Sequence, residues 1–117
     1  MADLTDYSEN KLAAVLTDKP WIKLHVGHPG EAGTANPAAE STRKQVTLAA
    51  GMFGVRASTT EAVWAEVSTA ETITHVSAWD AATGGNCEWV AALPSPKAVK
   101  AGGTLRAKAG ALTFALA

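Results

Sequence analysis

The 117-residue sequence lacks three things: a pair of cysteines, a long apolar run and an excess of charge of one sign. Its one cysteine, Cys87, cannot form an intrachain disulfide, so folding does not require an oxidising compartment. No apolar run approaches the roughly 18 to 20 residues that span a bilayer. Ten basic residues against eleven acidic ones leave no positive field for a phosphate backbone. We therefore expect no nucleic-acid partner and no membrane partner.

The N-terminal residues also lack the features of an export signal. Asp3, Asp6 and Glu9 precede the apolar residues, whereas a signal peptide begins with basic residues and continues with a longer apolar stretch. We expect synthesis in a cytoplasm. The net charge of −1 favours association over repulsion, and the length suits a single domain over residues 1–117. Together these features suggest a subunit of an assembly.

Residues 5–16 carry the one convincing helical pattern. Apolar side chains recur there at the spacing of an amphipathic helix, with Tyr7 at the edge of the stripe. Thr5 or Asp6 can cap the first turn. Pro20 ends the helical region, because the residue before a proline is disfavoured in helical geometry.

After Pro20 the pattern changes to the period of two that is typical of half-buried strands. Ile22 and Leu24, for example, alternate with Lys23 and His25. Further strand-like segments are separated by turn residues such as those at 94–96, and these segments cover residues 43–49, 61–67, 72–79, 87–93, 98–99, 104–107 and 111–116. The sequence therefore predicts a mainly β fold, an antiparallel β-sandwich or a partly open barrel over residues 21–117, with one N-terminal α-helix.

Residues 27–40 interrupt this pattern with three glycines and two prolines, which predicts a long loop. The loop follows a strand, as a phosphate-binding loop does. However, no helix and no Gly-Lys-Ser or Gly-Lys-Thr follows it, so nucleotide binding is not expected. It is the one stretch long enough to grip a neighbouring molecule.

Three histidines, His25, His28 and His75, could in principle be combined into a metal site. Their spacing joins a strand to a glycine-rich loop, and carboxylate or cysteine partners at ligand spacing are lacking. We interpret them as ordinary surface histidines. No metal and no cofactor are expected.

His75, Ser77 and Asp80 supply the residue types of a hydrolytic triad. The nucleophile elbow and oxyanion donors that such a site needs are not recognisable, and cross-strand polar residues are a simpler explanation. A lone Cys87 that alternates with apolar residues is predicted to be a small core residue. We therefore predict no catalytic residue. A hydrolase that uses these three residues stays a minor alternative to the functions considered below.

The four tryptophans could form a sugar-binding platform or act as buried anchors. All lie within predicted strands, so most are expected in the core or at a subunit interface, where their rings bury large areas. They are Trp21, Trp64, Trp79 and Trp89.

Several segments, taken in order, match a known pattern. They are Leu-Thr-Asp-Tyr-x-Glu-Asn-Lys-Leu at 4–12, His-Pro-Gly-Glu-Ala-Gly-Thr-Ala-Asn-Pro at 28–37, Glu-Ser-Thr-Arg-Lys at 40–44, Thr-His-Val-Ser-Ala-Trp-Asp-Ala-Ala-Thr-Gly-Gly at 74–85 and Pro-Lys-Ala-Val at 96–99. This order resembles a family of small structural proteins of tailed bacteriophages, notably those that infect actinobacteria. Its members are labelled tail-fibre or minor tail proteins in some genomes and minor capsid or capsid decoration proteins in others.

The resemblance implies a virion component without catalytic residues, made in the host cytoplasm. We expect a capsid decoration protein that binds the outside of the major capsid lattice and stabilises it, with the major capsid protein and copies of itself as partners. The alternative is a tail or tail-fibre component with a receptor- or glycan-binding role. The predicted contact residues lie on the helix, the first strand, the loop and the 61–67 strand, and they are Tyr7, Lys11, Trp21, Lys23, His28, Glu31, Asn36 and Trp64.

Overall fold

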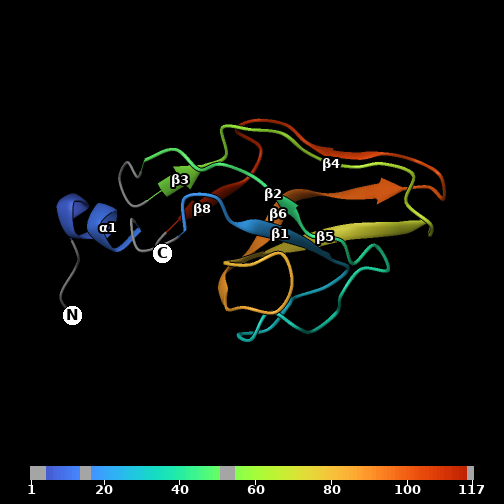
Figure 1. The fold of residues 1–117 in the computed structure, drawn as a ribbon, viewed down its shortest axis with the longest axis horizontal. Helices are drawn as coiled ribbons and strands as arrows, with labels where there is room; N and C mark the ends of the chain where they lie inside the picture. The colour runs from blue at the N-terminus through green and yellow to red at the C-terminus, as the bar shows by residue number, and fades with distance from the viewer. Residues whose placement is uncertain (1–4, 14–16, 51–54, 116–117) are drawn as a thin grey trace.

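A computed structural model describes residues 5–13, 17–50 and 55–115 of the chain, which are mainly β with antiparallel pairing. The elements, in chain order, are α1 (Asp6–Ala13), β1 (Trp21–His25), β2 (Lys44–Gln45), β3 (Val55–Ala57), β4 (Ala62–Trp64), β5 (Glu71–Trp79), β6 (Cys87–Val99), β7 (Leu105–Ala107) and β8 (Thr113–Ala115) (Figure 1). The strands form one four-stranded sheet in the order β2-β1-β5-β6 and two ribbons, β3-β8 and β4-β7. In this part of the chain they do not close into a barrel, because β6 and β7 each pair with a single strand.

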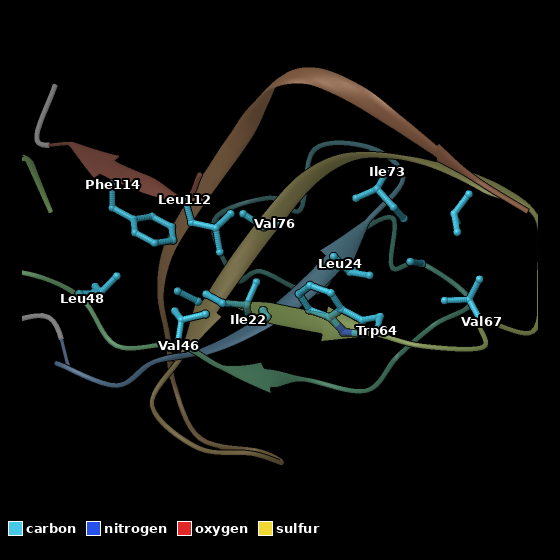
Figure 2. Packing of buried hydrophobic residues seen from close by; sticks show 14 residues of the cluster. Ile22, Leu24, Val46, Leu48, Trp64, Val67, Ile73, Val76, Leu112 and Phe114 are labelled. Carbon is cyan, nitrogen blue, oxygen red and sulfur yellow. The ribbon is translucent and has the colours of Figure 1, made fainter. Parts of the chain in front are cut away.

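The core lies between the inner face of the four-stranded sheet and the two ribbons. Because side chains alternate along a strand, Ile22 and Leu24 of β1 enter the core, where they are at most 2% exposed. Trp64 of β4 and Phe114 of β8 meet them from the other side (Figure 2). The indole Nε1 of Trp64 donates a hydrogen bond of 2.8 Å to the carbonyl oxygen of Thr42, so its polar atom is satisfied inside the core.

The long strand β6 contains a large bulge where the sequence predicts a turn at 94–96. His75 of β5 pairs with Ala92 and Ile73 pairs with Lys97, so residues 93–96 lie opposite a single residue of β5. The prediction of a turn is therefore wrong: the chain continues in the same direction and bows away from its neighbour. Prolines at 94 and 96 suit this position, because a bulge needs fewer ladder hydrogen bonds than a regular strand.

Strand β3 is absent from the sequence-based prediction. It pairs with β8, and its inward-facing residue is Arg56, which is only 3% exposed. The guanidinium donates hydrogen bonds to Asp18 Oδ1 at 2.7 Å and to the carbonyl oxygen of Ala49 at 2.8 Å. A buried arginine breaks the alternation of apolar and polar residues, so the pattern gives no sign of a strand here.

The N-terminal helix differs from its prediction. α1 covers eight residues and lies beside β3 at one end of the molecule (Figure 1). Its expected core-facing stripe is not borne out, because Leu12 is 50% exposed and Tyr7 74%. Residues 14–16, the end of the predicted helix, lie outside the described residues. Within the described ranges, no helix has the length and apolar character to cross a membrane.

Candidate functional site: the loop-covered face of the sheet

The outer face of the four-stranded sheet is covered in part by residues 27–40, which we call the cover loop. The loop turns back beside β1, and Ala38 N donates to the carbonyl oxygen of Leu24 at 3.0 Å, while Val26 N donates to that of Asn36 at 2.9 Å. The far end of the loop is fixed by Glu71 of β5, whose carboxylate accepts hydrogen bonds from two consecutive main-chain amides, at 39 and 40. The predicted loop is thus ordered by hydrogen bonds from its main chain to β1 and to the Glu71 carboxylate.

Beneath the cover loop lies a buried polar cluster, which we call the polar lock. It consists of His25, Ser77 and Trp79, which are 0%, 0% and 6% exposed, together with the carbonyl oxygen of Ala35. The cross-strand register of β1 and β5 brings these side chains to the same face. His25 Nδ1 lies 2.9 Å from the Ala35 oxygen, and His25 Nε2 lies 2.7 Å from Ser77 Oγ. Trp79 Nε1 donates to the same Ser77 oxygen at 2.7 Å.

These contacts assign the tautomer of His25 in its neutral form. A carbonyl oxygen only accepts, so His25 Nδ1 carries the proton and Nε2 accepts one from the Ser77 hydroxyl. Ser77 in turn accepts from the indole of Trp79. Every polar atom is then paired with His25 neutral. Burial is the main cause that lowers the pKa of His25 below its usual value, and the nearby Lys23 charge acts in the same direction.

Gly33 brings the cover loop into direct contact with the sheet. Its φ of +74° is unfavourable for other residues, and a Cβ added there would collide with Cys87 Sγ and would stand 3.2 Å from the Trp79 ring. Burial under this loop raises the pKa of the Cys87 thiol. The thiol is therefore protonated at neutral pH and unsuited to act as a nucleophile.

Residues 80–86, which connect β5 to β6 and which we call the tip loop, lie beside the cover loop (Figure 1). Arg43 stacks 4.1 Å over the Trp79 ring and donates to the carbonyl oxygens of Ala81 and Gly84 at 2.8 and 2.7 Å. Asp80 accepts from the Asn86 main-chain amide at 2.8 Å, and this hydrogen bond is the main cause that lowers the pKa of its carboxyl. The tip loop is thus held by Arg43 and by the hydrogen bond between its own two ends, Asp80 and Asn86.

Five of the eight predicted contact residues lie on or around this face. Of these, Trp21 and Lys23 are half-buried on β1, and three others are exposed on the cover loop, namely His28, Glu31 and Asn36. Tyr7 and Lys11 lie together on α1, with the ammonium 5.8 Å from the ring centre. Trp64 is 1% exposed in the chain's own core and so offers no surface to a partner. A role in partner contacts stays a prediction for the other seven.

The two arrangements of chemical groups that the sequence made possible, a hydrolytic triad and a three-histidine metal site, were not expected, and their residues lie as follows. Ser77 bonds to His25 rather than to His75, whose Nδ1 pairs with Thr74 Oγ1 at 2.8 Å. Asp80 pairs with Asn86, so the three residue types of the hydrolase alternative do not converge. The interpretation of His25 as a surface histidine is wrong, because the cover loop buries it completely. Among the described residues, no three histidine, cysteine or acidic side chains are placed to hold a metal ion.

Sequence reasoning also missed Arg43 and Gly33, which help to hold the loops of this face in place. A glycine between alanine and threonine in a loop rich in breakers gives no local signal of a contact 54 residues away with Cys87. The arginine likewise has no partner within its own segment, since it bonds to the tip loop.

The comparisons with known proteins identify a family. No curated protein matches the chain. A family model described as Podophage GP4 fiber I protein gp80 matches residues 2–115, almost the whole length. This match includes both loops of the covered face and every strand of the fold. The chain therefore belongs to the podophage GP4 fiber I protein gp80 family, a family of phage structural proteins.

Proposed function

We propose that this chain is a structural subunit of a podophage fibre. The observation that carries the proposal is the family match, which spans residues 2–115 and whose description names a fibre protein. The sequence-based expectation favoured a decoration protein on the capsid exterior, with the fibre as the alternative. The family description favours the alternative, so capsid decoration becomes the competing outcome of the test.

A fibre subunit must be held by its neighbours, and one end of the molecule offers apolar surface for this. Tyr7 and Leu12 of α1 are 74% and 50% exposed, and Val55 of the adjacent strand β3 is 37% exposed. These side chains belong to two neighbouring elements at the same end of the molecule, and exposed apolar surface is a feature of association sites. We infer that copies of the chain, or another fibre protein, pack against this end.

The covered face is suited to a different role, namely presenting fixed loops. The polar lock, Gly33 and Arg43 hold the cover loop and the tip loop in one arrangement. Ordered loops lose little conformational entropy on binding, so this face is the better candidate for contact with a receptor or a neighbouring fibre protein. A platform of stacked tryptophans for sugars is not favoured, since Trp64 and Trp79 are at most 6% exposed.

Location in the particle tests the proposal directly. Gold-labelled antibodies against the chain, viewed by electron microscopy on intact virions, should mark the fibres at the tail. Quantitative mass spectrometry of separated heads and tails should find the chain in the tail fraction, at tens of copies per particle or fewer. Label spread over the head, with hundreds of copies per particle, would establish the capsid alternative and overturn the fibre proposal.

A pair of variants tests the association end. Leu12→Asp should shift the purified chain to a smaller species in size-exclusion chromatography with light scattering. Val26→Asp is a matched control, because Val26 is 42% exposed but lies on the cover-loop side. A wild-type chain that is monomeric alone and also when mixed with the other fibre proteins would refute association through α1, as would equal dissociation of both variants.

A further inference from the structure

An apolar groove opens between the bulge of β6 and the ribbon that contains β7. Its volume is about 390 Å³, within the range of small-molecule sites. Its floor is made by core residues such as Ile73 and Leu112, and its walls include the half-buried Leu93 and Leu105. The bulge accounts for the opening, because residues 93–96 bow away from β5 instead of closing over the core.

An added β-strand is a poor occupant of this groove. The exposed edges of β6 and β7 flank it, but Pro94 and Pro96 have no N–H to donate to an incoming strand. The bulge also removes the regular spacing that strand pairing requires. The shape therefore suits a small molecule better than an extended peptide.

Charge selects the kind of small molecule. Residues 89–117, which supply most of the groove, contain four of the ten basic residues of the chain and none of its eleven acidic residues. Two of these basic residues, Lys97 and Arg106, line the groove, and no acidic residue is among its described lining. Arg106 pairs with Glu61 at 2.9 Å, but both side chains are well exposed, so an anion at the rim can compete for the guanidinium.

We propose that this groove binds a small anionic amphiphile, a medium-length alkyl chain that ends in a carboxylate. The alkyl chain lies between Leu93 and Leu105, and the carboxylate lies at the rim beside Lys97 and Arg106. The branched aliphatic lining favours an alkyl chain over a sugar, which would leave its hydroxyl groups unpaired. This proposal goes beyond the fibre function and does not depend on it.

Octanoate, octanol and octylammonium form the probe set, with binding followed by calorimetry and by NMR of the amide signals. Octanoate should bind one to one with a dissociation constant on the order of 1 mM or tighter, and it should shift signals of residues 93–97 and 105–113. Octylammonium should bind more weakly than octanoate. Lys97→Gln should weaken octanoate binding by about two- to five-fold, as expected for one exposed charge pair, and should leave octanol binding unchanged.

Two further variants separate the groove from the rest of the surface. Lys100→Gln removes a neighbouring charge that does not line the groove and should have no effect. Ala107→Leu places a larger side chain in the groove and should abolish binding of both octanoate and octanol, whereas Ala98→Leu, outside the groove, should not. Thermal melting confirms that each variant is folded. Absence of octanoate binding, signal shifts confined to other residues, or equal effects of the Lys97 and Lys100 variants would each overturn the proposal.

Discussion

Acid should destabilise this protein through one buried side chain, His25. Its imidazole is completely buried, and both nitrogens are paired, one as a donor to the Ala35 oxygen and one as an acceptor from Ser77. A second proton on His25 would point an N–H at Ser77 Oγ, which already accepts from Trp79. The hydroxyl proton of Ser77 would then lose its acceptor inside the lock. Protonation therefore costs both a desolvated charge and a hydrogen bond.

The sign and size of the effect follow from proton linkage. The folded state lowers the pKa of His25, mainly by burial, while the unfolded chain has the ordinary value near 6.5. Above about pH 6.5 the residue is neutral in both states and stability is complete. Below that value the unfolded state takes up a proton that the folded state refuses, so stability falls by at most about 1.4 kcal/mol per pH unit until the folded pKa is reached.

Urea unfolding at pH 7.5, 6.5 and 5.5 measures this loss. The wild-type free energy of unfolding should fall by up to about 1.3 kcal/mol between pH 7.5 and 5.5. His25→Gln, which has no titrating group at this position, should lose most of that dependence whatever its absolute stability. His75→Gln is the matched control, since His75 is the cross-strand partner of His25 but is only partly buried.

Other titratable and charged groups lie on this face, and their contribution to the pH dependence must be separated from that of His25. Lys23 is on the same strand and face, and the His28 ring contacts the His75 ring at a tilt of 59°, with ring centres 5.5 Å apart. The lowered pKa of Asp80 acts only below its ordinary value of 3.8 and so falls outside the range tested. A wild-type stability that is flat from pH 7.5 to 5.5, or a slope that persists in His25→Gln but vanishes in His75→Gln, would refute the reasoning.

Four further substitutions test the contacts that order this molecule. Gly33→Ala should lower the free energy of unfolding in urea by about 2–4 kcal/mol, because it combines a positive φ with a steric collision. It should also speed the labelling of Cys87 by a thiol reagent, and unchanged labelling would show that the cover loop does not shield the thiol. Arg43→Met should keep the contact with the Trp79 ring but lose two hydrogen bonds, which lowers the free energy of unfolding by about 1–2 kcal/mol. Amide exchange in the tip loop should become faster, and unchanged exchange would show that Arg43 does not hold this loop. Arg56→Met should lower the free energy of unfolding by about 2 kcal/mol or more. Asp18→Asn should lower it less, because asparagine retains an acceptor and the Asp18 side chain is 80% exposed. The reverse order would show that the ion pair contributes more than the buried carbonyl contacts.

The sequence predicted the β class and most strand positions because the inner face of the main sheet follows a simple rule. Ile22 and Leu24 alternate with polar residues, and the register of β1 with β5 keeps that alternation across the pair. Where a strand breaks the rule, prediction fails. β3 carries a buried arginine at its centre, and β6 runs through two prolines because a bulge tolerates them.

The outer face was predicted least well, because its burial comes from a segment distant in the sequence rather than from the alternation itself. Lys23 and His25 sit on the side of β1 that looks polar and solvent-facing in the sequence. Only the returning cover loop turns part of that side into a second buried layer. No local pattern contains that information. It arises from two contacts of His25 on β1, one with Ala35 in the cover loop and one with Ser77 on β5.

This second layer explains how a loop rich in glycine and proline can be fixed in place. The breakers prevent a helix or a regular strand, and the bond between buried His25 and the Ala35 oxygen adds to the main-chain hydrogen bonds that tie the loop to β1. The lock favours one arrangement of the cover loop, because a loop in another position would leave the buried His25 Nδ1 without its acceptor, the Ala35 oxygen. Ser77 is fully buried and bonds to two buried side chains, so the His25–Ser77 pair acts here as a structural contact that ties β1, β5 and the cover loop together.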